Sequence, residues 1–465
     1  MIRTLIVSFL LLIAVFSNGQ LPLRLPSILG NHAVLQQNSK VKVWGWGPGS
    51  MQVAIVCSWN SHDTIFAAIG ADCDWETTIN TPKTGGTHSI EFVCGKQKIT
   101  IEDIVLGEVW LCSGQSNMEF NMNWGITDAG STLENCDNNQ IRFFQVKQSY
   151  NRYPQTNCEG EWKISDKKTM PTFSSVGYFF GRRLNDQLKA PVGLIGSYWG
   201  GTCIQTWMPK EAFDKNPDLQ KTKDNIEAYG WAPKGACLLY NAMIYPITKY
   251  RIAGTIWYQG EANVATEYNE YSRLFTGMIE GWREAFDNNF PLYFVQIAPC
   301  NYYDGIKSAY LREQQELTLQ VPNTGMVSVA DLVDDVSNIH PGKKRAVGER
   351  LSNLALKEQY GYTELQPYSP HFNQMTIKAD KVLVSVISNG KLSCKEEQIK
   401  NFQLAGSDQQ FHPASAIIKK DGAIQLSSPE VKNPVAVRYC FTNEATSNLF
   451  DVNNLPLLPF RTDKW

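Results

Sequence analysis

The stretch GEVWLCSGQSNMEF, residues 107–120, joins an apolar segment to a polar turn. Residues 108–112 have the near-continuous apolar character of a strand that is covered on both faces of a parallel sheet. They run directly into the turn-forming residues 113–117, which include Ser116. A serine at the end of a buried strand is either part of a turn or a nucleophile, and the rest of the sequence has to distinguish the two.

The composition indicates a globular protein of more than one domain. The chain has 465 residues, which is too long for one ordinary core, and 43% of them are hydrophobic. The 43 Lys and Arg residues nearly balance the 45 Asp and Glu residues, and no basic stripe is present, so nucleic acid is not an expected partner. The only basic run, residues 343–345, is interpreted as a solvated helix start. The six histidines are scattered and no Cys-x-x-Cys occurs, so we expect no metal site.

The N-terminus has the layout of a secretory signal peptide. One arginine precedes an apolar run from Leu5 to Phe16, and small and polar residues follow. The run is too short to span a bilayer, so we expect residues 1–19 to be removed and the mature protein to be secreted or periplasmic, with no membrane contact; an uncleaved anchor is the alternative. Export permits disulfides, and Cys394 with Cys440 is a reasonable pair among the 11 cysteines.

The pattern of apolar residues changes twice along the mature chain. Residues 20–105 contain short strand-like runs at the spacing of a small β-sandwich. Residues 106–360 alternate strand-like and amphipathic helical runs, which predicts a doubly wound α/β domain with a parallel sheet. Residues 361–465 return to strand character, either as a second β module or as strands that pack onto the first. The expected strands of the α/β domain are 108–112, 192–197, 253–258, 292–298 and 326–331, with helices near 176–188, 271–286 and 341–355.

Polar clusters follow four of the five expected strands. They are Ser116 after the first, Gly200-Gly201-Thr202 after the second, residues 259–263 after the third, and residues 331–340 after the last. Reactive groups of an α/β sheet collect at the carboxyl ends of its strands, so we expect these clusters to converge.

Ser116 needs a base to act as a nucleophile, because a free hydroxyl is almost fully protonated at neutral pH. His340 is the only histidine in residues 106–360 and is therefore the candidate base. The acid that orients a catalytic imidazole is left open by the sequence. Its candidates are Asp331, Asp334, Asp335 and Glu261.

Acyl transfer also needs donors for the developing oxyanion. The backbone N–H of Ser116, a backbone N–H of Gly200 or Gly201, and the side chain of Gln259 or Asn263 are available. Aromatic residues flank the motifs, and Trp199, Trp257 and Tyr258 are candidates for stacking on a sugar ring, although core packing is the alternative for some of them.

The sequence blocks resemble those of a known family. Gly114-Gln115-Ser116-Asn117-Met118, followed in order by GSYWGGTCIQTWMP (196–209), WYQGEAN (257–263) and NIHPGKKRAVGERL (338–351), is similar to the sialate O-acetylesterase family of the SGNH hydrolase superfamily. The related acetylxylan esterases resemble it less closely.

The resemblance implies an esterase that removes acetyl groups from O-acetylated sialic acid or another acetylated sugar without a cofactor. It implies Ser116 as the nucleophile, His340 as the general base and an oxyanion hole of the donors named above. One departure is that Ser337 stands where the superfamily has an Asp, three residues before the histidine. Glu261 is then favoured over Asp335 as the orienting acid, and a Ser–His dyad is the third option. A carbohydrate-binding protein with an inactive hydrolase core is the alternative of another class.

Overall fold

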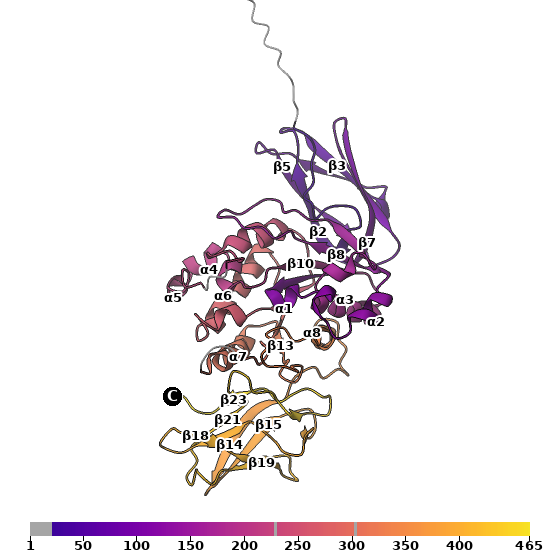
Figure 1. The fold of residues 1–465 in the computed structure, drawn as a ribbon. Coiled ribbons are helices and arrows are strands. Elements are labelled where there is room, and N and C mark those ends of the chain that lie inside the picture. Colours follow the sequence, from indigo (N-terminus) through magenta and orange to yellow (C-terminus); the bar gives the residue numbers. More distant parts are fainter. Residues whose placement is uncertain (1–20, 227–229, 302–304) are drawn as a thin grey trace, which may run out of the picture.

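Three regions follow one another along the computed structural model, which describes residues 21–226, 230–301 and 305–465. An N-terminal and a C-terminal β region lie at opposite ends of a central α/β region (Figure 1). The predicted signal peptide, residues 1–19, lies outside the described residues. No helix within the described ranges is long and apolar enough to cross a bilayer.

The N-terminal β region is built from short strands with alternating burial, which pair antiparallel except for β1, whose partner β7 is parallel. In β3, for example, Val53, Ile55 and Cys57 are buried while the residues between them are partly exposed. β2 pairs with β5, whereas β3 pairs with β4 and β6, and both sets contribute to one hydrophobic core. The strands are β1 (Val34–Gln36), β2 (Ser39–Trp46), β3 (Gln52–Cys57), β4 (Thr64–Ala68), β5 (Asp74–Thr81) and β6 (His88–Cys94).

One long strand, β7 (Gln97–Gly114), belongs to both the N-terminal β region and the central sheet. Its first half pairs antiparallel with β6, and its second half pairs in parallel with β10 and β11. The predicted boundary at residues 105 and 106 therefore falls inside a continuous strand. Because no linker separates the two regions, the N-terminal β region extends the strand that leads to Ser116.

The central sheet has the order β13-β12-β11-β7-β10-β8-β9, and every pair is parallel except β8 with β9. A mixed α/β fold with a mostly parallel sheet and additional β regions is thus confirmed. Two strands of this sheet, β8 and β9, are not predicted. In β8 the charged Arg142 interrupts the apolar run. Arg142 is nonetheless buried and pairs with Asp103 at 3.1 Å. The strands are β8 (Asn138–Gln145), β9 (Trp162–Ser165), β10 (Val192–Tyr198), β11 (Gly254–Tyr258), β12 (Leu292–Val295) and β13 (Thr324–Val327).

Helices cover both faces of the sheet. Trp110 and Cys112 of β7 share a core with α3 (Ser175–Leu188) and α8 (Lys344–Glu358), whereas Leu111 shares the opposite core with α6 (Tyr271–Ala285). This alternation places successive residues of one strand on opposite faces. The helices near 176–188, 271–286 and 341–355 are confirmed. The remaining helices, which are not predicted, are α1 (Ser116–Glu119), α2 (Ala129–Glu134), α4 (Lys210–Asp214), α5 (Pro217–Gln220) and α7 (Lys307–Leu317).

The C-terminal β region has a core of its own. Two four-stranded sheets, β14-β15-β20-β19 and β18-β17-β21-β23, contribute to one hydrophobic cluster. The expected Cys394–Cys440 disulfide is wrong, because both are free thiols that donate to the carbonyls of Gln398 and Thr446. The strands are β14 (His371–Lys378), β15 (Lys381–Ile387), β16 (Ser393–Cys394), β17 (Phe402–Ala405), β18 (Phe411–Pro413), β19 (Ser415–Ile418), β20 (Ile424–Ser427), β21 (Ala436–Tyr439), β22 (Leu449–Phe450) and β23 (Phe460–Arg461).

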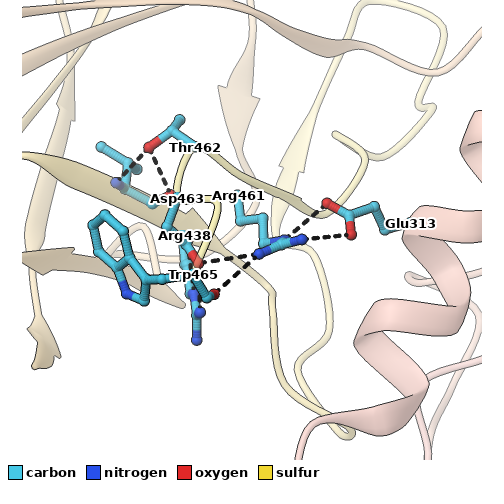
Figure 2. Close-up of polar contacts among 7 residues, drawn as sticks. Glu313, Arg438, Arg461, Thr462, Asp463 and Trp465 are labelled. Carbon is cyan, nitrogen blue, oxygen red and sulfur yellow. Dashed lines mark hydrogen bonds and ion pairs between the residues drawn. The ribbon is translucent and has the colours of Figure 1, made fainter. Parts of the chain in front are cut away.

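Arg461, which is itself paired with Asp463, connects this region to the central α/β region. Arg461 donates to both carboxylate oxygens of Glu313 on α7, at 2.9 and 3.1 Å (Figure 2). Asp463 accepts hydrogen bonds from Arg438 at 2.9 and 2.6 Å and from Arg461 at 3.3 Å. Burial of the Asp463 carboxyl opposes its ionisation, but the two guanidinium groups outweigh it and lower its pKa.

Replacing Asp463 with Asn leaves two guanidinium groups facing a neutral amide, and we expect a loss of about 3 kcal/mol in unfolding free energy. The lowered pKa of Asp463 means that its carboxylate stabilises the fold above the unfolded pKa of about 4 and ceases to do so as pH falls through the folded value. Urea unfolding of wild type and Asp463→Asn, measured at pH 7 and again near pH 3, checks this. If the difference in unfolding free energy between wild type and Asp463→Asn is no smaller near pH 3 than at pH 7, this expectation is contradicted.

Candidate active site

The strand register brings three carboxyl ends to one level. Gly114, the last residue of β7, lies opposite Tyr198 of β10 and Tyr258 of β11. A Cβ atom on Gly114 would lie 2.2 Å from the carbonyl oxygen of Tyr258, and its φ of +138° also favours glycine. The backbone N–H of the next residue, Gln115, donates to that same carbonyl at 3.0 Å. Ser116 then begins α1 beside the two neighbouring strand ends.

Ser116 and His340 are in contact. The Oγ atom of Ser116 lies 2.9 Å from Nε2 of His340, although 224 positions separate them in the chain. His340 lies in the loop between β13 and α8, where its backbone N–H donates to Oδ1 of Asn338 at 2.9 Å. Its ring stacks on Phe120 with centroids 5.1 Å apart. The convergence predicted for the first and last strand ends is therefore present in the structure.

The surroundings of His340 keep its imidazole neutral. Burial, followed by the positive charge of Lys344, lowers the pKa of His340 from 6.5 to about 4. A neutral imidazole has a free lone pair on one nitrogen, so His340 can accept the hydroxyl proton of Ser116 at neutral pH.

The candidate acids do not contact the imidazole. Asp335 is on the loop surface and accepts hydrogen bonds from the backbone N–H and the hydroxyl of Ser337, at 2.9 and 2.7 Å. Glu261 accepts from Asn117 at 2.6 Å. Neither forms a hydrogen bond with His340, so the expectation that one of them orients the ring directly is corrected. Two further candidates are used in ion pairs, Asp331 with Arg350 and Asp334 with Lys343.

A buried acid, amide and base lie directly behind the Ser116–His340 pair. Nδ2 of Asn117 donates to Oε1 of Glu261 at 2.6 Å and to the carbonyl oxygen of Ile339 at 3.0 Å, while Nζ of Lys344 donates to Oδ1 of Asn117. Burial raises the pKa of Glu261 and lowers that of Lys344. Asn117 follows Ser116 and Ile339 precedes His340, so one amide connects the two chain segments of the site.

Sequence reasoning missed this network. Lys344 belongs to the basic run that we interpreted as solvated, but only 1% of its surface is exposed. Lys343 and Arg345, by contrast, have exposed side chains paired with Asp334 and Asp128. The only sequence feature that could have indicated a role for Lys344 in the site is its position as the first residue of α8, the helix after the His340 loop.

Two backbone N–H groups remain for an oxyanion. The N–H of Gly200 donates to Oε2 of Glu119 at 2.7 Å and is therefore occupied. The N–H groups of Ser116 and Gly201 have no acceptor in the part of the chain that the structure describes, and both residues line the same pocket. Gly201 has a φ of +74°, which suits glycine.

Gln259 and Asn263 are not placed as oxyanion donors, which corrects that expectation. Both side chains are fully buried and line no part of the pocket. Nε2 of Gln259 donates to the carbonyl of Thr202 and to Oδ1 of Asn263, and Nδ2 of Asn263 donates to Oε1 of Gln205. These bonds brace the loop that carries Gly200 and Gly201 from beneath. The sequence cannot reveal this, because the direction of a strand-end side chain depends on tertiary packing.

The pocket above Ser116 has a volume of about 460 Å³. Trp257 and Tyr258 do not reach it: both are buried in the core, and Trp257 packs against Trp207 and Trp282. Trp199 lines a neighbouring cavity instead. Among the described residues no group of three or more His, Cys, Asp or Glu side chains is arranged to hold a metal ion. The lining of the pocket comprises Gln115, Ser116, Gly200, Gly201, Trp231, Glu261, Ala262, Val264, Ala265, Cys300, Asn301, Ile339 and His340.

A serine in contact with a neutral imidazole at the carboxyl edge of a parallel sheet is an arrangement of hydrolytic enzymes of the α/β class. Residues 106–357 match the family model described as carbohydrate esterase, sialic acid-specific acetylesterase, and the chain belongs to this family. It is accordingly a carboxylic-ester hydrolase.

Sialate O-acetylesterases of mammals match most of this chain. The human sialate O-acetylesterase is 28% identical over 460 residues, covering 90% of this chain and 87% of that protein. The rat sialate O-acetylesterase is 25% identical over 459 residues, covering 85% of this chain and 84% of that protein. Among solved structures, a carbohydrate acetylesterase from Xanthomonas citri superposes with a TM-score of 0.86 at 31% identity, covering 95% of this chain and all of that one.

The pKa of His340 predicts an unusually low acid limit for activity. We expect kcat/KM for an aryl acetate to fall with a midpoint near pH 4, because only the neutral imidazole accepts a proton. Replacing Lys344 with Met removes a positive charge near the ring, which raises the pKa of His340 and moves the acid limb to higher pH. Lys343→Met, the neighbouring lysine on the surface, is the matched control and should leave the limb in place. An unshifted limb in a folded Lys344→Met protein would show that this charge does not act on His340.

Proposed function

We propose that this protein removes O-acetyl groups from carbohydrate through an acetyl-enzyme on Ser116, with O-acetylated sialic acid as its first substrate. The observation that carries the proposal is the 2.9 Å contact between the Ser116 hydroxyl and Nε2 of His340 at the edge of a pocket, in a chain of this family. The names of the human and rat relatives support the choice of sugar.

In the first half of the reaction His340 is the general base. With its proton on Nδ1, its Nε2 takes the hydroxyl proton as Oγ of Ser116 attacks the acetyl carbonyl carbon. The tetrahedral intermediate then breaks its bond to the sugar oxygen, and the imidazolium returns the proton to that oxygen. The sugar leaves with a free hydroxyl and the acetyl group stays on Ser116.

In the second half a water molecule replaces the sugar. His340 removes a proton from the water as its oxygen attacks the acetyl carbon. The tetrahedral intermediate then breaks its bond to Oγ of Ser116, which receives that proton, and acetic acid leaves and ionises to acetate in the solvent. The oxyanion formed in both halves is stabilised by the N–H groups of Ser116 and Gly201. Gln115 adds an amide at the pocket wall, where its Oε1 is held by the N–H groups of Gly260 and Ala262 at 3.4 and 3.2 Å.

The finer class and the location belong to the same proposal. The order of the Ser116 block, the Gly200-Gly201 loop and a final His340 supports membership of the SGNH hydrolase superfamily, with a Ser–His dyad in which Asn117 and the stacked Phe120 fix the two partners. The segment 1–19 supports secretion or a periplasmic location, with the segment removed.

A second candidate is an esterase for another acetylated carbohydrate, such as acetylated xylan. The solved relative from Xanthomonas citri favours it, because that protein is described by the broader term carbohydrate acetylesterase. The two β regions keep open the alternative of a carbohydrate-binding protein with an inactive core, which the Ser116–His340 contact opposes.

Replacing Ser116 with Ala should abolish turnover of an aryl acetate, because the Ser116 hydroxyl is the group that contacts Nε2 of His340. A loss of roughly 10⁴-fold or more in kcat is expected for removal of the nucleophile. Circular dichroism and thermal unfolding should match wild type, since the hydroxyl contributes one hydrogen bond. Retained activity in a folded Ser116→Ala protein would mean that the nucleophile is misassigned.

A comparison of substrates separates the two sugar specificities. We expect a higher kcat/KM for O-acetylated sialic acid than for acetylated xylan, measured by acetate release at equal concentrations of acetyl ester. A clear preference for xylan would contradict the sialate assignment while leaving the esterase mechanism in place. Ser116→Ala is the blank for both substrates.

A further inference from the structure

A second cavity adjoins the pocket above Ser116. It has a volume of about 900 Å³, and Trp231 lines both spaces. Trp199 also connects them, because it lines the second cavity while the next residue, Gly200, lines the first. A sugar whose acetyl group reaches Ser116 can therefore extend past Trp231 into this second cavity.

The described lining of the second cavity carries positive charge. Among the residues that the structure describes, Arg152 and Lys234 are its charged lining residues, and no Asp or Glu of those ranges lines it. Neither cation forms an ion pair or a side-chain hydrogen bond within the described ranges, whereas most lysines and arginines near the Ser116 site are paired. Two positive charges at one cavity, with no counterion among the described residues, favour an anionic ligand.

The segment that carries Arg152 is fixed in place. Asn241, whose surface is only 6% exposed, donates from Nδ2 to the carbonyl oxygens of Asn151 and Arg152 at 3.2 and 3.0 Å. The backbone N–H of Asn151 donates to the carbonyl of Leu238 at 3.1 Å. These bonds hold the loop against a segment almost 90 positions away, close to Lys234. The backbone that carries Arg152 is therefore held by bonds within the protein, which lowers the entropy cost of binding.

Aromatic side chains complete the cavity. Tyr150 and Trp231 are 61% and 68% exposed, and the ring of Tyr150 lies 6.4 Å from that of Trp199. Exposed aromatic rings beside a polar cavity can pack against the C–H faces of a sugar ring. Charge and shape together point to a ligand with a carboxylate on a sugar-sized ring.

We propose that this cavity binds the carboxylate-bearing ring of an acidic sugar, with Arg152 and Lys234 as its charge partners and Trp231 as its stacking surface. The proposal rests on the proposed function and assigns its specificity for sialic acid to these residues. An O-acetyl substituent of a ring held there extends past Trp231 toward Ser116.

Binding without turnover tests the proposal. In a Ser116→Ala background we would titrate free sialic acid and its methyl ester, which has the same ring without the charge, by calorimetry at low salt. The acid should bind at least roughly tenfold more tightly than the ester, because a charge-assisted hydrogen bond contributes that much or more. Adding Arg152→Gln or Lys234→Gln should each weaken binding of the acid by roughly tenfold, and raised salt should weaken it in the background protein. Lys432→Gln, an exposed lysine of the C-terminal β region, is the matched control and should change neither ligand's affinity.

Each contrary outcome is specific. Equal affinity for the acid and its methyl ester, or an unchanged affinity in the Arg152→Gln and Lys234→Gln proteins, would overturn the proposal. Absence of binding in the background protein would overturn it as well. Failure of the proposed function appears elsewhere, as absent acetate release by wild type, so the two failures are distinguishable.

Discussion

The side-chain amide of Asn117 is the contact on which the site depends. It donates to Glu261 and to the carbonyl of Ile339, and it accepts from Lys344. Only a side chain with both a donor and an acceptor can satisfy a buried carboxyl, a buried ammonium and a backbone carbonyl together. Removing one member of such a buried group leaves another without its partner, which costs more than the contact itself contributes. The same amide fixes the spacing between Ser116 and His340, so stability and reactive geometry have one cause.

The long strand β7 transmits rigidity to that contact. It is anchored in the N-terminal β region, forms the centre of the parallel sheet, and ends at Gly114 against the carbonyl of Tyr258. Only a glycine permits this approach, and the next residues turn at once into α1. Catalytic groups are held more exactingly on strands and their first turns than on long loops. His340 does lie on a longer loop, which explains why its neighbour Ile339 is bonded to Asn117 and its ring is stacked on Phe120.

The sequence predicted those residues of the site whose place depends on the ends of parallel strands. It did not predict those whose place depends on tertiary packing. Ser116 and His340 could be predicted, because parallel strands place their carboxyl ends together and the α/β region has one histidine. Gln259 could not, since strand-end residues look alike in sequence whether they face a pocket or brace a loop. Lys344 was misinterpreted for a related reason. A run of three basic residues at a helix start resembles a solvated run, and burial of the middle one depends on Asn117 in α1 and on Glu261 in the turn after β11. Likewise, β8 was not predicted because Arg142 breaks its apolar pattern. The ion pair with Asp103 that allows Arg142 to be buried joins residues far apart in the sequence.

No carboxylate of the described residues forms a hydrogen bond with the imidazole, and this changes how the Ser116–His340 pair works. A carboxylate partner would stabilise the imidazolium and raise the pKa of His340, whereas burial and Lys344 lower it to about 4. The ring is then a weaker base but is wholly in its basic form at neutral pH, and once protonated it is a stronger acid toward the departing sugar oxygen. In the proposed mechanism, the charge that stabilises the imidazolium is the oxyanion itself, held between the ring and the N–H groups of Ser116 and Gly201. In an acetyl ester of a sugar the leaving group is an alkoxide, which leaves poorly unless it is protonated. Its departure is therefore the step that gains most from a strong acid. The low pKa of His340 therefore suits the transfer of a proton from the imidazolium to the sugar oxygen better than the earlier transfer from Ser116 to His340.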